Sequence, residues 1–210
     1  MATTLTAGNA TNGLSLTPDN TGILQVKTGT GSGTTALTLD ASQNTTIAGN
    51  LTLTGNASGI LKSGTAVAST SGTSIDFTGI PSTAKRITVM FSGVSTNGAS
   101  FKRVQLGDSG GIETTGYLGS DSQNATPATT TGGFDIASNA AADVIHGAMI
   151  IMNITGNTWV CMAMTGKSDA GTIHTGGFSK SLSDVLTQVR ITTVNGTDTF
   201  DAGTINILYE

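Results

Sequence analysis

Apolar and polar residues alternate along most of the chain with a period of two, the spacing of side chains on one face of a β-strand. In the C-terminal two thirds, the alternating runs are rich in Val, Ile, Thr and aromatic residues and are separated by Gly and Asn. These runs predict strands at Ser74–Phe77, Arg86–Val94, Phe101–Leu106, Phe134–Ala137, Val144–Ile154, Trp159–Thr165, Ile173–Phe178, Val185–Val194 and Ile205–Tyr209. This density of strands is typical of an antiparallel β-sandwich, and we expect a jelly-roll-like one. The stretch 137–144 is the one short segment that suits a helix.

The first third of the chain has a sparser pattern, in which short Leu-x-Leu runs are separated by Gly, Asn and Asp. Each run offers two or three apolar side chains, too few to offset the roughly 1–2 kcal/mol per residue that ordering a backbone costs. We therefore expect residues 1–61 to form an oligomeric β-rich arm or shaft, which buries these side chains against other copies of the chain. The expected contact residues are Leu14, Leu16, Ile23, Leu24, Val26, Leu37, Leu39, Leu51 and Leu53. A flexible linker is the alternative.

The composition changes at the same place as the pattern. The chain has 210 residues, including 39 Thr and 29 Gly, yet no aromatic residue precedes Phe77. Because aromatic side chains contribute most to a core, residues 75–210 are expected to form the folded head domain. Residues 62–74 are small and polar and read as a linker. The expected fold is thus all-β, with an N-terminal arm and a C-terminal sandwich.

The charge and cysteine content exclude several classes of protein. Charged residues make up 10% of the chain, the net charge is −4, and no basic cluster exceeds two residues. Nucleic acid is therefore not an expected partner. No apolar run approaches the roughly 20 residues of a membrane helix, so membrane insertion is not expected. The single Cys161 excludes an intrachain disulfide.

Two glycine-rich stretches look like motifs for catalysis or phosphate binding, but their sequence context favours loops and turns. The stretch Gly107–Gly111 reads Gly-Asp-Ser-Gly-Gly, as around the nucleophilic serine of trypsin-like proteases, where the histidine base precedes the serine. Both histidines of this chain follow Ser109, which favours a polar loop. The stretch Gly29–Gly33 lacks the helix that a phosphate loop needs and reads as a turn.

Metal-binding and acid–base chemistry have candidate residues but no diagnostic spacing. His146, His174 and Cys161 form no close ligand pair, although a symmetry axis would bring copies of one histidine together. Glycoside hydrolysis needs two facing carboxylates, which neighbouring chains could supply. The candidates are Asp76, Asp108, Glu113, Asp121, Asp135 and Asp143. We expect no catalytic residue, no cofactor and no metal ion.

Several stretches resemble fibre-like virion proteins of tailed bacteriophages. In the N-terminal part these stretches are Ala7–Gly13, Asp19–Gly29 and Ala36–Asn44. The more distinctive stretches are similar to a C-terminal domain of phage and prophage fibre or tail proteins, and they are Ile75–Pro81, Lys85–Phe91, Val189–Gly196 and Phe200–Glu210. Together they cover nearly the whole chain.

The resemblance implies a homotrimeric, non-enzymatic component of the virion, assembled in the cytoplasm of a bacterial host. Its partners would be other copies of itself, other tail or capsid proteins, and a glycan or protein of the host cell surface. Loops of the head are expected to contact this receptor, because binding residues concentrate on long polar loops. The expected contact residues are Asn97, Asp108, Ser109, Tyr117, Asp121, Gln123, Asn124 and Thr130. A capsid decoration protein and a glycan-cleaving enzyme are the alternatives.

Overall fold

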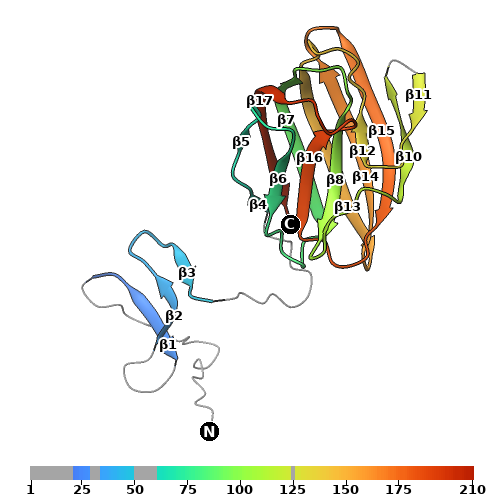
Figure 1. The fold of residues 1–210 in the computed structure, drawn as a ribbon. Coiled ribbons are helices and arrows are strands. Elements are labelled where there is room, and N and C mark those ends of the chain that lie inside the picture. The colour runs from blue at the N-terminus through green and yellow to red at the C-terminus, as the bar shows by residue number, and fades with distance from the viewer. Residues whose placement is uncertain (1–20, 29–33, 50–60, 124–125) are drawn as a thin grey trace, which may run out of the picture. The chain divides into compact units, whose positions relative to one another are not determined.

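The computed structural model describes residues 21–28, 34–49, 61–123 and 126–210, and the chain divides into two units, Met1–Ser58 and Gly59–Glu210 (Figure 1). Every regular element in these described ranges is a β-strand, so the all-β prediction is confirmed. The stretch 137–144 forms a tight loop instead of a helix, because the Asp143 carboxylate accepts hydrogen bonds from the backbone N–H groups of Asn139 and Ala140.

The N-terminal unit contains a three-stranded antiparallel meander. Its strands are β1 (Leu24–Thr28), β2 (Thr34–Leu39) and β3 (Thr45–Ile47), in the order β1-β2-β3. The turn between β2 and β3 is fixed by Asp40, whose carboxylate accepts hydrogen bonds from the N–H groups of Ser42 and Asn44 at 2.9 Å. Two of the apolar runs in the sequence thus become paired strands.

The C-terminal unit consists of two sheets. The larger sheet runs in the order β11 (Thr126–Thr129), β10 (Tyr117–Gln123), β15 (Thr172–Ser181), β14 (Thr158–Lys167), β13 (Ile145–Thr155), β7 (Arg86–Thr96), β17 (Phe200–Tyr209) and β4 (Lys62–Ser63), and β5 (Val67–Ala68) also pairs with β17. The smaller sheet runs in the order β12 (Phe134–Ile136), β8 (Lys102–Asp108), β16 (Gln188–Thr193) and β6 (Ile75–Thr78), with β9 (Gly111–Ile112) beside β8. All nine strands predicted for the head are present.

The strand pairs are nested around one hairpin. The antiparallel pairs β7–β17, β8–β16 and β10–β15 enclose the β13–β14 hairpin in sequence. The three consecutive strands β13, β14 and β15 lie side by side in the larger sheet. We describe the architecture as an antiparallel β-sandwich, and its jelly-roll character stays a prediction.

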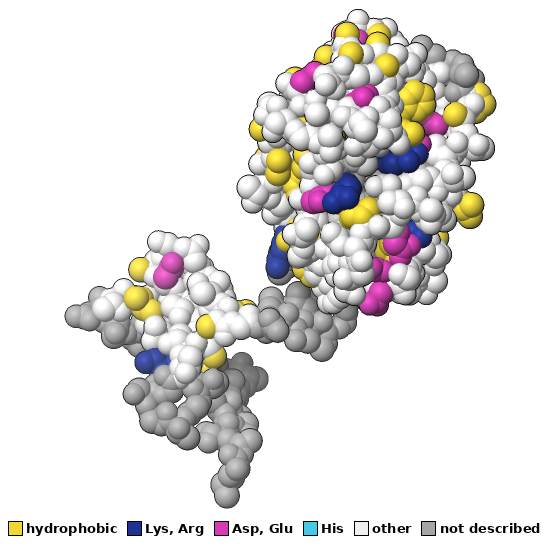
Figure 2. All heavy atoms as spheres, viewed as in Figure 1, with side chains coloured by type: hydrophobic (Ala, Val, Ile, Leu, Met, Phe, Trp, Pro, Cys, Tyr) yellow, Lys and Arg dark blue, Asp and Glu magenta, His cyan; other side chains and the backbone are white. Residues whose placement is uncertain are grey.

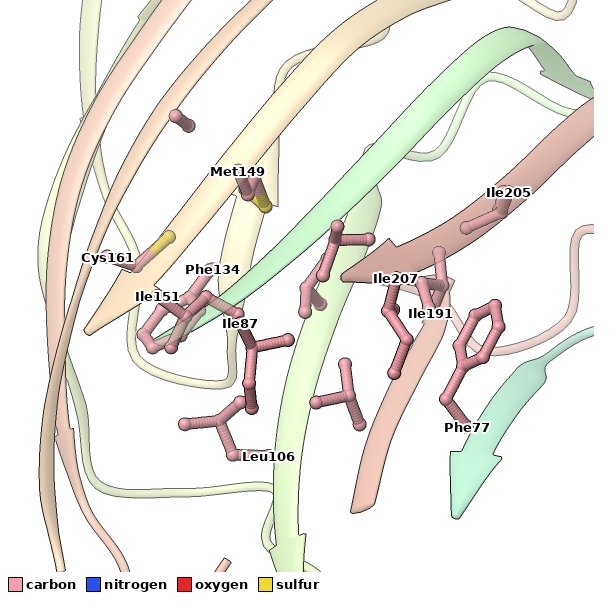
Figure 3. Close-up of a cluster of buried hydrophobic side chains, with 14 of the residues drawn as sticks. Phe77, Ile87, Leu106, Phe134, Met149, Ile151, Cys161, Ile191, Ile205 and Ile207 are labelled. Carbon is pink, nitrogen blue, oxygen red and sulfur yellow. The ribbon is translucent and has the colours of Figure 1, made fainter. Parts of the chain in front are cut away.

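The core lies between the inner faces of the two sheets. Alternate residues of each strand point inward, as the period-two pattern requires. Ile87, Val89 and Ile151 on the larger sheet and Leu106 and Ile191 on the smaller sheet are completely buried. Figure 3 shows side chains from both sheets meeting in this layer. The period-two hydrophobic pattern therefore accounts directly for the core.

Residues 62–74 are not the linker that the sequence suggests. Strands β4 and β5 within this stretch both pair with β17. Ser69 is fully buried, and its N–H and hydroxyl donate to the carbonyl oxygens of Gly203 and Ala202 at 2.9 and 2.8 Å. Backbone pairing to an edge strand needs no large side chains. Short strands made of small polar residues therefore cannot be recognised from the sequence pattern. The folded head begins near residue 61.

The strand directions define two ends of the sandwich. We call the end at which Lys62 of β4 pairs with Tyr209 of β17 the proximal end. The distal end is the opposite one, where the chain connects β7 to β8, β12 to β13, β14 to β15 and β16 to β17. The distal loops comprise residues 97–101, 137–144, 168–171 and 194–199.

Candidate functional site

The predicted contact residues of the N-terminal unit fall on one face of its meander. Register pairs Leu24 with Leu39, Val26 with Leu37, and Leu37 with Ile47, so these side chains share a face. We call these five residues the meander stripe. Val26 is 45% exposed and Ile47 41%, and no residue of the meander whose side chain is described is buried.

The other predicted contact residues of this unit divide into two groups. Ile23 precedes β1 and is 39% exposed. The remaining four lie outside the described residues: Leu14, Leu16, Leu51 and Leu53. The role of all these residues in oligomerisation stays a prediction.

Four of the predicted receptor contacts are buried, so their assignment to exposed loops is wrong. These residues are Tyr117, Asp121, Thr130 and Asp108. The Tyr117 ring packs edge-on against Phe134, and its hydroxyl oxygen accepts the Leu106 N–H at 2.7 Å. Asp121 contacts the buried ring of His174 at 3.1 Å. The hydroxyl of Thr130 donates to the carbonyl oxygen of Gly133 at 3.0 Å.

Asp108 holds a loop in place at the proximal end. Its carboxylate accepts hydrogen bonds from the Ser183 hydroxyl at 2.7 Å and from the N–H groups of Gly110 and Asp184. The Ser183 hydroxyl makes the largest contribution to lowering the pKa of Asp108. The neighbouring Ser109 is exposed, and its hydroxyl lies 3.3 Å from the Asp184 carboxylate. This loop is structural, in agreement with the polar-loop interpretation of the sequence.

The remaining predicted receptor contacts do not form a single site. Asn97 is exposed at the distal end, where its side-chain oxygen accepts the Thr199 N–H. Gln123 is half-buried at the distal end of β10, and Asn124 lies outside the described residues. Ser109 lies at the opposite, proximal end. The exposed candidates are thus distributed over both ends of the sandwich.

A polar hollow of about 340 Å³ lies on the outer side of the smaller sheet. Register places Arg103 beside Thr192 and Gln105 beside Arg190, so outward side chains of β8 and β16 form its floor. Its lining consists of Thr73, Ser74, Arg103, Gln105, Thr114, Arg190, Thr192, Thr193, Val194, Asn195 and Gly196. The side of the head in Figure 2 is mainly uncharged; Lys or Arg lies next to Asp or Glu in its middle and lower part, and Asp or Glu stands alone in its upper part.

The two arginines of the hollow are each paired with one carboxylate. Arg103 contacts Asp135 through two hydrogen bonds of 2.6 and 2.9 Å, and Arg190 contacts Asp76 through two of 2.7 Å. Burial raises the pKa of Asp135 against the opposing effect of Arg103, whereas the hydrogen bond from Arg190 to Asp76 raises the pKa of that arginine. Each positive charge is balanced by one carboxylate, so the hollow carries no net positive charge that would attract an anion.

The hollow offers hydrogen-bonding groups in fixed positions. Both arginine pairs use Nε and Nη2, and the Nη1 donors have no partner among the described residues. Gln105 donates its Nε2 to the Gly132 carbonyl at 2.8 Å, which fixes its side chain and leaves Oε1 as an acceptor. Donors and acceptors without net charge suit an uncharged, hydroxyl-rich ligand. The sequence analysis missed this site because its residues come from distant segments that only strand register brings together.

Neither histidine is placed to act as a base. The Gly93 N–H donates to Nδ1 of His146, so the proton of a neutral ring lies on Nε2, which contacts the Ser168 hydroxyl at 3.2 Å. That arrangement cannot take a proton from Ser168. His174 is 1% exposed, and its burial lowers its pKa. It is enclosed and has no access to a substrate.

One pair of candidate carboxylates does meet. The Ser183 hydroxyl lies 2.7 Å from Asp108 Oδ2 and 2.8 Å from Glu113 Oε1, and Lys180 forms an ion pair with Glu113. The hydrogen bond from the Ser183 hydroxyl lowers the pKa of Asp108. At Glu113, burial raises the pKa, but the hydrogen bonds from Lys180 and Ser183 outweigh it, so the pKa of Glu113 is also lowered. A general acid in glycoside hydrolysis needs a raised pKa. Both carboxylates accept a hydrogen bond from the loop residue Ser183, so the pair anchors this loop.

Among the residues that the structure describes, no group of three His, Cys, Asp or Glu could hold a metal ion. The described part of the chain also has no helix of sufficient length and hydrophobicity to cross a membrane. No family model matches the chain, and no curated protein sequence matches it either.

Proposed function

We propose that the chain is a non-enzymatic structural protein of a tailed-bacteriophage virion, a homotrimeric fibre whose sandwich head adheres to the host surface. The N-terminal unit provides oligomerisation and attachment to the particle. The head presents its surface to the solvent, where three copies of one weak site gain avidity from their high local concentration. The resemblance of the sequence to fibre-like virion proteins suggests this setting.

The observation that carries the proposal is the meander stripe, in which Val26 and Ile47 are exposed and Leu24, Leu37 and Leu39 are half-buried. Five apolar side chains lie on one face of a three-stranded sheet, and the described part of that unit has no buried residue. A small isolated sheet of this kind is marginal in water. Burial of the stripe against equivalent stripes of two sister chains supplies the missing core and obeys closed symmetry.

Adhesion is assigned to the polar hollow of the smaller sheet. Its neutral floor of Arg103, Gln105, Arg190 and Thr192 can exchange hydrogen bonds with the hydroxyl groups of a surface glycan. Its lining has no aromatic residue, so sugar-ring packing would depend on Val194 and the threonine methyl groups. One copy would bind weakly, which is the situation in which trimeric presentation matters.

The first test is the oligomeric state of the full chain. Light scattering should give three times the chain mass of 21.0 kDa. The double variant Leu37→Asp, Leu39→Asp places charges on the stripe and should weaken the trimer at least about ten-fold. Thr38→Asp, on the opposite face of the same strand, is the control and should remain trimeric. A full-length monomer with the N-terminal unit folded would contradict the proposal.

The second test is the location of the chain in assembled particles. Density at the tail would support the fibre assignment. Density at threefold capsid axes would replace it with the decoration role, in which the N-terminal unit clamps capsid subunits.

The third test is ligand binding by the hollow. An array of bacterial surface glycans should retain the trimeric chain, and Arg190→Ala should reduce that retention at least about ten-fold through lost avidity. Lys62→Ala is the control, because Lys62 is an exposed cation of the head that lies outside the hollow. Equal effects of the two substitutions would exclude the hollow as the adhesive site.

A further inference from the structure

The outer face of the larger sheet carries an apolar patch at its centre. Register pairs Ile150 with Met162 and Met152 with Val160, and it places Met90 and Met164 on either side of Ala148. Since paired residues share a face, these side chains form one continuous surface across β7, β13 and β14. We call Met90, Ile150, Met152, Val160, Met162 and Met164 the outer apolar face.

This face is partly open to solvent in the single chain, where Met90, Ile150 and Val160 are half-buried and its other three residues are exposed. Met164 is 68% exposed, Met162 is 55% exposed and Met152 is 37% exposed. Ile154, which continues the outward row of β13, is 62% exposed. Isolated exposed apolar residues are ordinary, but a contiguous group of this size on a soluble chain marks a contact surface.

The strands beneath the face have the sequence of strands that are covered on both sides. Residues 148–152 of β13 and 160–164 of β14 are unbroken apolar runs, in contrast to the alternation in the smaller sheet. Strands with one face in water normally alternate between apolar and polar residues. Their inward residues, such as Met149 and Ile151, already fill the core. The outward residues therefore call for a second covering layer.

The charge distribution identifies the kind of partner. At the outward positions of β7, β13, β14 and β15, the one charged side chain is Arg86, and it is paired with Glu210 at 2.7 Å. The chain as a whole has a net charge of −4, so a neutral face lets copies meet without adding to their mutual repulsion. A neutral, apolar face is compatible with itself and offers little to a glycan or to nucleic acid.

We propose that the outer apolar face is the contact between the heads of sister copies of this chain. Three heads that turn this face toward a common axis would each cover the patches of the other two. The inference rests on the proposed homotrimer and adds to it the surface that joins the heads. It leaves the polar hollow, on the other sheet, facing outward and free to bind.

Methionine oxidation tests the proposal on the intact full-length chain. Hydrogen peroxide converts accessible methionine to the sulfoxide, and mass spectrometry follows each residue separately. Met162 and Met164 should oxidise at least about ten-fold more slowly in the native trimer than in the unfolded chain, although they are exposed in a single copy. Thr78→Met places a methionine on the outward side of the smaller sheet as a control, which should oxidise nearly as fast as in the unfolded chain.

The outcomes separate this inference from the proposed function. A trimer in which Met162 and Met164 oxidise at the unfolded rate would overturn the inference and leave the homotrimer in place. A monomer would overturn both, and protection of these methionines within a monomer would mean that the chain covers the face itself. Slow oxidation within a trimer supports the inference.

A charge substitution gives an independent readout. Met162→Glu should raise the chain concentration at which half of the trimer dissociates at least about ten-fold, because three carboxylates would meet in an apolar contact. Thr78→Glu adds the same charge to the smaller sheet and should leave association unchanged. Circular dichroism of both variants monitors folding, and the oxidation experiment on the unsubstituted chain decides the matter if Met162→Glu does not fold. Equal association of the two folded variants would overturn the inference.

Discussion

Several polar side chains inside the sandwich are paired, whereas Trp159 Nε1 and Thr165 Oγ1 are buried without a hydrogen-bond partner among the described residues. Lys167 lies 2.7 Å from Asp143, and Lys102 donates to the hydroxyl of Ser138 at 2.5 Å. Burial lowers the pKa of Lys102, and this effect is larger than the opposing effect of the nearby Asp143 carboxylate, which raises it. An unpaired buried polar group costs much more free energy than an exposed one, so removal of one partner should destabilise the fold measurably.

Tyr117 provides the first such test. Its hydroxyl accepts the Leu106 N–H and also lies near the Leu106 and Glu113 carbonyl oxygens. Tyr117→Phe keeps the ring packing but leaves a buried N–H without its acceptor, so we expect a loss of about 1–3 kcal/mol in the free energy of unfolding. Chemical denaturation measures this loss. Tyr209→Phe, whose hydroxyl bonds to no described residue, is the control, and equal stabilities of the two variants would contradict the expectation.

His174 makes stability dependent on pH. Burial lowers its pKa in the folded chain, despite the raising effect of Asp121, whereas the unfolded side chain has an ordinary pKa of about 6.5. The unfolded chain therefore binds the proton more readily, and stability should fall as the pH drops below about 6.5. Thermal unfolding between pH 7.5 and about 5 should show this slope in the unsubstituted chain. His174→Gln should flatten it, and a slope unchanged by this substitution would refute the role of His174.

At the scale of the element, one glycine is required where β13 passes between β7 and β14. Gly147 has a φ of 127° at a register shift, and an added Cβ would lie 2.8 Å from the Cα of Thr165. Gly147→Ala should destabilise the head by roughly 1–3 kcal/mol. Gly177→Ala is the matched control, because its added Cβ would meet no atom within 4 Å. Thermal unfolding compares the two, and similar melting temperatures would show that the sheet relaxes around the methyl group.

The strands that the sequence analysis missed share a physical cause. Strand β10 reads Tyr-Leu-Gly-Ser-Asp-Ser-Gln, so its small polar residues predict a loop, and this is why Tyr117 and Asp121 were assigned to one. Pairing with β15 over Tyr117–Gln123 supplies the backbone hydrogen bonds that make it a strand. The nine predicted strands carry alternating apolar residues, which give a local signal, whereas β4, β5, β9 and β11 carry little of it.

At the scale of the whole molecule, the two units differ in self-sufficiency. The head has a continuous buried core, and the described part of the N-terminal unit has none. A chain beginning at residue 61 should therefore fold alone. A chain beginning at residue 75 loses β4, β5 and Ser69, which exposes the edge of β17.

We expect the shorter fragment to melt at least about 5 °C lower and to aggregate more readily. Circular dichroism during heating, with light scattering alongside, compares the two fragments. Equal melting temperatures would mean that residues 62–74 act as a linker after all.

The sequence by itself determined the class of the fold, the nine alternating strands of the head and the aromatic-free first third, because these follow from local patterns of side chains. The tertiary structure decided which polar residues are buried, how the leading strands close the edge of β17, and which distant residues meet in the polar hollow. These features depend on strand register, and register joins residues of β8 and β16 that lie 81 to 91 positions apart in the chain. No local pattern encodes such a pairing, since it results from the packing of the whole sandwich.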